Sequence, residues 1–285
     1  MTSILITGGT GSFGQTFVRH LLRESEYERI CVFSRGEHIQ AEMASSLAHI
    51  PGATARIRYF IGDVRDLRRL RRALKDIDVV VHAAALKRIE VGHYNPVEMV
   101  KTNIEGAINV VEAARDAGVC KAVFLSTDKA FQPISPYGQS KALAERIILS
   151  ANDRHGPKFS VTRYGNIWNS KGSVYPTWRR ILAAGNERVI VTDPDCTRFF
   201  MWLREAVSLV QDTIRSMRGG ETRIPTLPAY RLGDLAEAMG AGFNVVGLPE
   251  WEKKHESMAA GNSSDVARRL SVAELRDIIR ESQSV

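Results

Sequence analysis

Cysteine is scarce in this sequence: Cys31, Cys120 and Cys196 are the only three in 285 residues, and no two of them form a closely spaced pair. This scarcity excludes a small secreted scaffold held together by disulfides, and it favours the reducing cytoplasm. The seven histidines also show no spacing typical of metal ligands, so the sequence predicts no metal site.

Long hydrophobic runs are missing as well. No apolar stretch approaches the roughly 20 residues that a transmembrane helix needs, and the first residues lead into a short strand pattern without the features of a signal peptide. We therefore expect a cytoplasmic protein with no membrane span. Hydrophobic residues at 44% and charged residues at 25% are ordinary values for a globular chain with a sizeable core.

Acidic residues are too few to balance the basic ones, which leaves a net charge of +7. Much of this excess lies in residues 65–75, where Leu67, Leu70 and Leu74 repeat at intervals of three and four among basic positions. The pattern predicts an amphipathic helix with a solvated basic face. Because no aromatic residues alternate with these charges, we expect no nucleic-acid partner.

A glycine-rich turn between a strand and a helix stands at the start of the chain. The strand pattern of residues 3–7 is followed by glycines at 8, 11 and 14 and by a helical pattern that continues to Leu22. Such glycines permit a tight turn, a close approach of the backbone to a pyrophosphate, and close packing of helix on strand, with the helix N-terminus facing the phosphates. Cofactor contacts are expected from Gly8, Thr10, Gly11, Ser12, Phe13 and Gly14.

The end of the second expected strand, residues 29–33, bears on which dinucleotide binds. Ser34 and Arg35 stand where an NAD-preferring site usually has an acidic residue for the ribose 2′-hydroxyl. A hydroxyl and a guanidinium favour a 2′-phosphate instead. The sequence therefore predicts NADP rather than NAD, with Ser34 and Arg35 as cofactor contacts.

Strand patterns recur along the first half of the chain, with helical patterns between them. One strand is expected to run through residues 59–61, and others are expected over 78–85, 121–127 and 159–166. One long helix is expected after Asn95-Pro96. This alternation predicts an α/β fold, a Rossmann-like doubly wound parallel sheet whose ligands lie at the carboxyl ends of the strands. In this fold Asp63 would meet the adenine edge, and His82 is expected to pack at a strand end. Further cofactor contacts are predicted at Asp63, Val64, Ala83, Ala84, Ala85, Asn103, Tyr137, Lys141 and Tyr164.

The alternation weakens beyond residue 166. A strand is expected at 189–192 and helices at 204–217, 231–239 and 270–279. We predict an NADP-binding Rossmann domain over residues 1–166 and a smaller, mainly substrate-binding C-terminal region over 167–285 that interleaves with it.

Tyr137 and Lys141 stand four residues apart at the start of a helical pattern, so both project from one helix face. A lysine ammonium beside a phenol stabilises the phenolate and lowers the pKa of the tyrosine, which makes it a usable base near neutral pH. Thr127 and Asp128 belong to the same sheet edge. An isolated pair of this kind is more often an ordinary surface pair, but its place after a buried strand favours an active site.

Together these segments resemble an extended short-chain dehydrogenase/reductase, specifically the inverting UDP-N-acetylglucosamine 4,6-dehydratases of polysaccharide and surface-glycan biosynthesis. The resemblance covers residues 1 to about 240 in order. Its most telling pair is Asp128-Lys129, because retaining sugar-nucleotide dehydratases typically carry Asp-Glu there. The matching segments are 4–14, 59–66, 82–87, 94–96, 101–103, 125–130, 137–141, 163–166, 172–174 and 197–199.

The resemblance implies a reaction with no net redox change. Tyr137 takes the proton of a sugar 4-hydroxyl as hydride leaves C4 for the nicotinamide, Lys141 holds the ribose, and Thr127 orients the hydroxyl. Lys129 then removes the C5 proton, Asp128 protonates the departing 6-hydroxyl, and hydride returns to C6 of a 4-keto-6-deoxy sugar whose C5 is inverted. The implied catalytic residues are Thr127, Asp128, Lys129, Tyr137 and Lys141, and the implied substrate contacts are Lys87, Thr127, Asn166, Ser173, Val174 and Arg198.

This chemistry sets opposite requirements on two neighbours. Lys129 must be partly neutral, which burial and nearby cations favour, whereas Asp128 must hold a proton, which a nearby cation disfavours. The pair is expected to titrate as a unit. The resemblance further implies a UDP-linked substrate and a homo-oligomer.

The sequence also departs from the resemblance. Trp168-Asn169 replaces small residues, and Arg88-Ile-Glu90 differs after Lys87. Residues 252–256 echo a family motif, but Pro249 stands where an arginine for the nucleotide phosphates is expected. Two alternatives therefore stay open: a sugar-nucleotide 4-epimerase or simple reductase that uses Tyr137 and Lys141 alone, and a non-catalytic nucleotide-binding scaffold.

Overall fold

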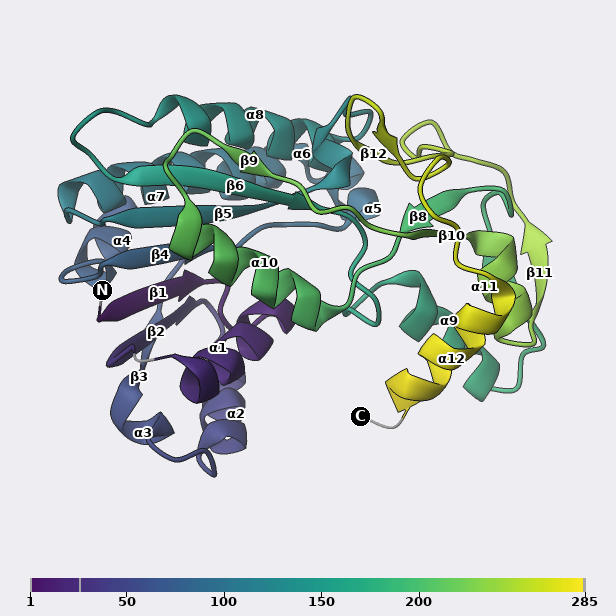
Figure 1. The fold of residues 1–285 in the computed structure, drawn as a ribbon, viewed down its shortest axis with the longest axis horizontal. Helices are drawn as coiled ribbons and strands as arrows, with labels where there is room; N and C mark the ends of the chain where they lie inside the picture. Colours follow the sequence, from purple (N-terminus) through teal and green to yellow (C-terminus); the bar gives the residue numbers. More distant parts are fainter. Residues whose placement is uncertain (1, 26, 284–285) are drawn as a thin grey trace.

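The computed structural model describes residues 2–25 and 27–283 of the chain. Its centre is a seven-stranded sheet in the order β3-β2-β1-β4-β5-β6-β9, in which all neighbouring strands are parallel. The order is that of doubly wound dinucleotide folds with one more strand at the edge, so the expected α/β class is confirmed (Figure 1). The strands are β1 (Ser3–Thr7), β2 (Arg29–Ser34), β3 (Ile57–Ile61), β4 (Val79–His82), β5 (Lys121–Thr127), β6 (Lys158–Tyr164) and β9 (Thr222–Arg223).

Helices cover both faces of this sheet, because successive residues of a buried strand point to opposite sides. In β1, Ile4 and Ile6 belong to one hydrophobic core and Leu5 to the other. The first core lies under α1 (Ser12–Glu24), α2 (Glu37–Leu47) and α10 (Leu203–Ser216). The second lies under α4 (Leu67–Ala73), α7 (Gly106–Asp116) and α8 (Pro136–Ser150).

The helix expected after Asn95-Pro96 is present but irregular. It begins as α6 (Pro96–Met99), widens into the π-helix η1 (Val100–Glu105) and continues as α7. Asn103 lies in the widened turn, and π-helical turns are frequent at functional sites. Shorter helices are α3 (Ala53–Arg56), α5 (Ile89–Tyr94) and the 3₁₀ turn η2 (Asp128–Ala130).

Residues after 166 contribute to two parts of the molecule. Helix α10 and strand β9 return to the large sheet, and Phe199 and Met258 also belong to its first core. The other elements form the C-terminal part of the molecule (Figure 1), most of them around a third hydrophobic core that contains Trp168, Tyr175 and Phe200. These elements are α9 (Val174–Ala183), β7 (Arg188–Val191), β8 (Thr197–Phe199), β10 (Ala229–Arg231), α11 (Leu232–Ala238), β11 (Gly242–Val245), β12 (Ser257–Ala259), β13 (Asn262–Ser263) and α12 (Val272–Gln283). Their strands pair only two by two, as β8–β10, β7–β11 and β12–β13.

Several boundaries differ from the sequence prediction. The strand expected at 78–85 ends at His82, because the backbone of Ala83 and Ala84 turns to bond Thr7. The basic helix expected over 65–75 is shorter, since the Asp66 carboxylate caps its first turn by accepting from Arg69 N at 2.9 Å. Strand β9 was not predicted at all.

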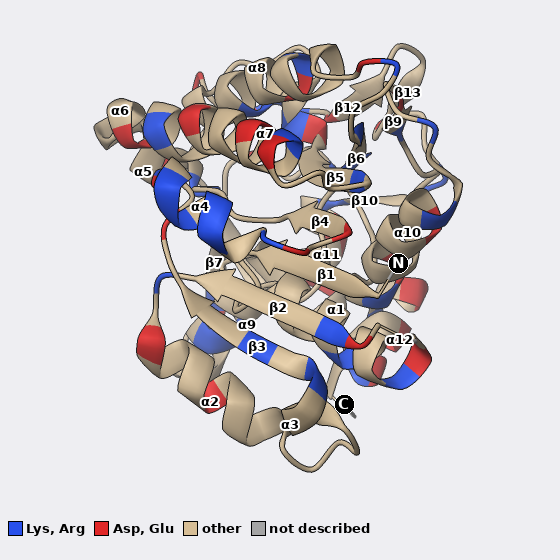
Figure 2. Cartoon of the chain, turned by 90° about the vertical axis from the view of Figure 1, so that its left-hand side faces the viewer, with Lys and Arg blue, Asp and Glu red and all other residues tan. Residues whose placement is uncertain are grey.

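Helix α4 is rich in basic residues (Figure 2), and its Arg68, Arg71 and Arg72 are exposed. Leu70 and Ala73 are buried beneath them, while Arg71 pairs with Asp116 and Arg69 donates to the carbonyl oxygen of Ile61. The expected solvated basic face is therefore confirmed.

Over residues 2–25 and 27–283, no helix combines the length and apolar character needed to cross a membrane. The same described residues contain no cluster of three or more His, Cys, Asp or Glu side chains placed to hold a metal ion.

Candidate active site

The turn between β1 and α1 leaves room for a phosphate group. Gly8 has φ of +65°, and a Cβ there would lie 2.8 Å from the backbone nitrogen of Ala84. A Cβ on Gly14 would lie 2.5 Å from Cα of Gly9, so α1 packs on the turn as closely as the sequence predicted. Gly11 caps α1 without a side-chain hydrogen bond, which leaves the first N–H groups of the helix available to an anion. The cradle therefore fits a dinucleotide pyrophosphate.

The exits of β2 and β3 form a charged edge next to this turn. The Arg35 side chain is 62% exposed, and its Nη1 lies 4.0 Å from Oδ2 of Asp63. Arg65 Nη2 pairs with the same carboxylate oxygen at 2.7 Å. Ser34 is buried, and its hydroxyl accepts from Gln40 Nε2 at 2.9 Å. Arg35 and Asp63 thus lie side by side at the sheet edge where the adenosine end of the cofactor was predicted.

Asn103 is more constrained than the sequence suggested. Its Oδ1 accepts from Leu86 N at 2.8 Å, and its Nδ2 donates to Leu86 O and to Ser140 Oγ, both at 2.9 Å. The buried amide therefore ties the loop after β4 to helix α8. Val64 and Tyr164 are buried in the two cores of the sheet, and Ala83, Ala84 and Ala85 are partly buried beside the glycine turn. Direct cofactor contact by these residues stays a prediction.

Tyr137 and Lys141 lie on the first turns of α8, against the end of β5. Lys141 is buried, and its Nζ donates to the carbonyl oxygen of Leu125 at 2.6 Å. Burial lowers the pKa of Lys141 to about 8, although the Glu145 carboxylate opposes this shift. His82 packs as predicted: its Nδ1 lies 2.8 Å from Thr7 Oγ1, and it is 2% exposed.

The expected pKa of Tyr137 is wrong for this structure. Burial raises the pKa of Tyr137 to about 12, and the Lys129 ammonium and the Thr127 hydroxyl reduce this effect only in part. The Lys141 ammonium is bound to the backbone carbonyl oxygen of Leu125. The tyrosine is therefore protonated near neutral pH in this structure.

Asp128 and Lys129 follow directly on the end of β5, in η2. Lys129 Nζ lies 3.1 Å from Asp128 Oδ1 and 3.0 Å from Glu256 Oε1, and it donates to Asn166 Oδ1 at 3.5 Å. The Thr127 hydroxyl donates to Asp128 Oδ1 at 2.8 Å. The side chains of Asp128 and Glu256 are 1% and 3% exposed, against 19% for Lys129. The lysine thus reaches the open space from between two buried carboxylates.

The two members of the predicted pair differ in how they meet their requirements. Burial raises the pKa of the Asp128 carboxyl; Lys129 opposes this effect and Glu256 adds to it, so Asp128 is suited to hold a proton. Burial by itself lowers the pKa of Lys129, but Asp128 and Glu256 outweigh it and hold that pKa above the ordinary value. The expectation that Lys129 is partly neutral is therefore wrong here, because its close neighbours are carboxylates.

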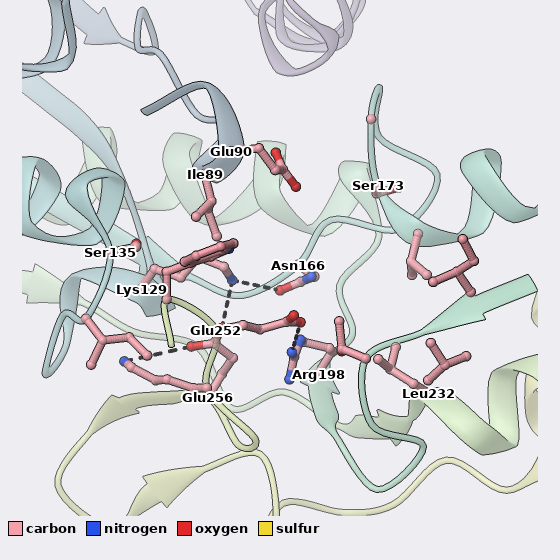
Figure 3. A pocket seen from close by; sticks show the side chains of 18 of the residues that line it. Ile89, Glu90, Lys129, Ser135, Asn166, Ser173, Arg198, Leu232, Glu252 and Glu256 are labelled. Atoms are coloured by element: carbon pink, nitrogen blue, oxygen red, sulfur yellow. Dashed lines mark hydrogen bonds and ion pairs between the residues drawn. The ribbon is translucent and has the colours of Figure 1, made fainter. Parts of the chain in front are cut away.

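A cavity of about 300 Å³ opens beside this cluster, between the carboxyl ends of β5 and β6 and the C-terminal segments (Figure 3). Lys129 and Asn166 form part of one wall, and Arg198, Glu252 and Glu256 form part of another. Arg198 is bound to Glu252 and donates to the carbonyl oxygen of Thr197 at 2.7 Å. The cavity is large enough for a sugar and polar enough to bind one.

The predicted substrate contacts divide into two groups. Asn166, Ser173, Val174 and Arg198 line the cavity. Thr127 lies behind it, hydrogen-bonded to Asp128, and Lys87 is exposed, with its ammonium donating to the carbonyl oxygen of Lys171 at 3.1 Å.

Sequence reasoning missed much of the C-terminal wall, although residues 252–256 carried a signal as a family-like motif. Among the residues not predicted as contacts, Ile89, Glu90, Trp178, Trp251, Glu252, Lys253 and Glu256 line the cavity. Of the departures from the family, Trp168 packs on Tyr175 with ring centroids 4.4 Å apart and donates to Ser282 Oγ, so it builds the third core. Pro249 lies in the loop before Trp251, and its carbonyl oxygen accepts from Glu252 N at 3.0 Å.

A family model described as "polysaccharide biosynthesis protein" matches residues 4–274. The chain is 42% identical over 267 residues to a UDP-N-acetylglucosamine 4,6-dehydratase (inverting) of Campylobacter jejuni, covering 92% of this chain and 78% of that protein. It is 37% identical over 280 residues to a UDP-glucose 4-epimerase of Rickettsia bellii, covering 94% of this chain and 80% of that protein.

Among solved structures, the dTDP-glucose 4,6-dehydratase DesIV of Streptomyces venezuelae, determined with NAD bound, superposes with a TM-score of 0.82. The similarity covers 99% of this chain and 97% of DesIV at 22% sequence identity, which establishes the shared fold.

Proposed function

Because the chain belongs to the polysaccharide biosynthesis protein family, we propose that it is a sugar-nucleotide 4,6-dehydratase that forms a 4-keto-6-deoxy product. Its substrate is UDP-N-acetylglucosamine, and C5 is inverted. The observation that carries this proposal is the Asp128-Lys129 ion pair at the end of β5, whose lysine lines the cavity. The similarity to the Campylobacter enzyme supports the substrate and the stereochemistry.

The cofactor in this proposal is NADP. The glycine turn and the N-terminus of α1 hold its pyrophosphate, Asp63 faces the adenosine, and Arg35 binds the 2′-phosphate. When bound, it supplies the hydride acceptor and donor of the reaction. The observation that favours NADP over NAD is the exposed Arg35 guanidinium at the end of β2, where NAD sites usually carry an acid.

At C4 of the sugar, Tyr137 accepts the hydroxyl proton. Its pKa of about 12 makes the phenol a weak acid, so the phenolate is a strong base once nearby positive charge favours its formation. The positive charge of Lys129 already lowers the pKa of Tyr137 in part. Thr127 orients the sugar hydroxyl. The resulting 4-ketone acidifies the hydrogen on C5.

Elimination then requires a base at C5 and an acid at the 6-hydroxyl. Asp128 is the acid, because burial favours its protonated form. Lys129 is the base, since it lines the cavity and its side chain is the most exposed of the cluster, at 19% against 1% for Asp128 and 3% for Glu256. Before its amine can accept the C5 proton, its ammonium must lose one to a neighbour or to solvent.

A 4-epimerase is the second candidate, because the chain is also 37% identical to the Rickettsia UDP-glucose 4-epimerase. Epimerisation needs Tyr137 and Lys141 but gives no role to an acid and a base beside C5 and C6. The buried Asp128–Lys129–Glu256 cluster therefore favours elimination.

The deciding experiment is incubation of the protein and NADP with a panel of UDP- and dTDP-linked sugars, followed by mass spectrometry of the products. Loss of one water from UDP-N-acetylglucosamine is the expected result. Unchanged mass with altered ring stereochemistry would establish epimerisation instead. Cofactor binding without turnover of any sugar nucleotide would indicate a non-catalytic scaffold.

We also propose that the enzyme is a cytoplasmic homo-oligomer. Light scattering would test the oligomeric state, and cell fractionation would test the localisation.

A further inference from the structure

Glu256 is a buried carboxylate with no role in the reaction described above. It lies just before β12 and reaches across the cavity wall to the end of β5, where its Oε1 lies 3.0 Å from Lys129 Nζ (Figure 3). Its other oxygen, Oε2, is buried without a hydrogen-bond partner and lies 3.8 Å from Lys253 Nζ. Burying a carboxylate costs free energy unless it is paired, so its position beside Lys129 calls for an explanation.

We propose that Glu256 acts through Lys129 by taking up the ammonium proton, so that the neutral amine can accept the proton of C5. This inference rests on the proposed dehydratase function and adds a residue to it. In the step, an N–H bond of Lys129 breaks and an O–H bond forms on Glu256. The C5–H bond then breaks, its hydrogen joins Lys129 Nζ, and its electron pair passes into the enolate of the 4-ketone. One proton has moved from C5 to Glu256, and the pair releases it before the next turnover.

The other carboxylate in contact with Lys129 is less suited to this task. Asp128 Oδ1 already accepts from the Thr127 hydroxyl as well as from Lys129, and its proton is needed for the departing 6-hydroxyl. Glu256 Oε1 has Lys129 as its close partner, and its side chain is 3% exposed, so the proton it receives stays away from solvent.

Burial and charge act on this pair in opposite directions. The largest single effect on each group is burial, which lowers the pKa of Lys129 and raises that of Glu256, and so favours the uncharged pair. Attraction between the charges outweighs it and keeps both ionised in this structure. The charged and titratable groups that act on the pair from the surrounding elements are Asp128, Tyr137, Arg198, Tyr230 and Lys253. Because proton transfer within the pair leaves its net charge unchanged, the fraction of neutral lysine does not depend on bulk pH.

The test compares parent, Glu256→Gln and a surface control across pH 7 to 9. Each protein is incubated with NADP and UDP-N-acetylglucosamine in heavy water, and deuterium incorporation at C5 is measured together with cofactor reduction. In the parent, C5 exchange per molecule of reduced cofactor should be flat with pH, because this ratio removes the pH dependence of the C4 step. In Glu256→Gln, the lysine proton must leave to solvent, so exchange should fall by roughly 10²–10⁴-fold at pH 7 and rise about tenfold per pH unit. Glu281→Gln, which removes a carboxylate paired with Arg204 on the surface, should behave as the parent.

The shape of the profile distinguishes the proton-acceptor role from a structural one. A uniform loss with a flat profile would mean that Glu256 only orients Lys129. Exchange at or above the parent rate would mean that it only keeps Lys129 charged. Either result overturns the proposal. Cofactor reduction in Glu256→Gln confirms that the variant is folded and that the C4 step is intact, and Glu256→Asp should recover part of the flat profile.

A second measurement does not depend on turnover. The ¹³Cε resonance of Lys129, assigned by its loss in Lys129→Met, should titrate at lower pH in Glu256→Gln than in the parent. An unchanged midpoint would show that the pair does not form, which would also overturn the proposal. If the parent converts no sugar nucleotide while the titration shifts as expected, the proposed function fails and the pairing stands.

Discussion

At the scale of single residues, Tyr137 has the most sharply defined role. Replacing it with phenylalanine removes only the hydroxyl, so NADP binding should stay nearly unchanged. Turnover of UDP-N-acetylglucosamine should fall by roughly 10²–10⁴-fold, the usual contribution of a positioned acid–base group. Calorimetric titration of NADP and a product assay measure the two effects. Tyr94→Phe, at a side chain that is 88% exposed, is the matched control. Turnover of Tyr137→Phe at the parent rate would assign the 4-hydroxyl proton to another residue.

Lys129 separates the first step of the reaction from the second. The variant Lys129→Met keeps a similar length but has no amine, so oxidation at C4 should proceed and elimination across C5 and C6 should not. Absorbance of the reduced cofactor should therefore appear with UDP-N-acetylglucosamine, while dehydrated product falls by roughly 10²–10⁴-fold. In heavy water the parent should place deuterium at C5 and the variant almost none. Undiminished C5 exchange in the variant would rule out lysine as the base.

Arg35 decides between the two cofactors. A charge-assisted contact of its guanidinium with a 2′-phosphate contributes roughly 1.5–3 kcal/mol, and NAD lacks that group. Arg35→Ala should therefore weaken NADP by roughly 10–150-fold and leave NAD nearly unchanged, as measured by calorimetric titration. Arg71→Ala, at an exposed arginine paired with Asp116, should change neither affinity. Equal losses for NADP and NAD in Arg35→Ala would refute the assignment.

The sequence predicted the site residues that lie close together along the chain, but not those that folding brings in from the C-terminal region. Asp128, Lys129, Tyr137 and Lys141 were recognisable because they follow one buried strand within a few residues. The ionic state of Lys129 was not predictable in this way, because it depends on Glu256, which folding brings from the C-terminal region. A pKa is set by what surrounds a group in space, and spacing along the chain reports only on near neighbours.

At the scale of secondary-structure elements, the junction of β1 and α1 is the part most sensitive to small changes. A methyl group on Gly14 would lie 2.5 Å from both Cα and O of Gly9, and these backbone atoms cannot move without displacing the turn. Gly14→Ala should therefore lower the free energy of unfolding by about 1–3 kcal/mol and weaken NADP binding. Urea denaturation and calorimetric titration measure these effects.

Gly36→Ala is the matched control for that prediction. Its added Cβ would meet only the flexible side chain of Ile39, at 3.2 Å, and its φ of −87° suits alanine. Its free energy of unfolding should stay within about 1 kcal/mol of the parent value. Equal destabilisation by the two substitutions would mean that close packing at Gly14 is not the cause.

Helices and strands with a regular pattern of apolar residues were predictable from the sequence. Elements that form only through contacts with other parts of the fold were not. Strands β1, β2, β4, β5 and β6 are runs of mostly buried residues, and α10 has an apolar stripe, so both types stand out in the sequence. Strand β9 is only Thr222–Arg223, and pairing with β6 alone makes it a strand. The π-helical turn around Asn103 is likewise a product of tertiary contacts, since Asn103 bonds both Leu86 and Ser140.

At the scale of the whole molecule, the cavity depends on the third core as much as on the sheet. Lys129 and Asn166 extend from the ends of β5 and β6, whereas Trp178, Val191 and Leu232 line the cavity from the third core. Arg163 joins the two parts, because it pairs with Glu145 on α8 and donates to the carbonyl oxygen of Met258 in β12. The chemistry therefore requires the full described fold, and the division into a cofactor part and a substrate part stays a proposal about binding.

The stability of the whole molecule should depend on pH through His82, which lies at the centre of the sheet between Thr7 and Phe124. Burial lowers the pKa of His82 from 6.5 to about 3, and the Lys141 ammonium adds to the shift. Between these two pH values the unfolded chain binds a proton that the folded protein does not. The contribution of His82 to stability is therefore fully present above pH 6.5 and is lost as the pH falls towards 3.

This linkage predicts that His82 makes the free energy of unfolding about 2 kcal/mol lower at pH 5 than at pH 7. His82→Asn keeps a polar group near Thr7 but cannot titrate, so its loss of stability between pH 7 and pH 5 should be smaller than that of the parent by about this amount. His49→Asn, at an exposed histidine, should show the parent difference. Urea denaturation of the three proteins at both pH values isolates the contribution of His82 to the free energy of unfolding. The other groups that titrate between pH 5 and pH 7 contribute equally to the parent and to the variants. Equal losses in parent and His82→Asn would mean that His82 is solvated or already charged in the folded protein, contrary to its burial.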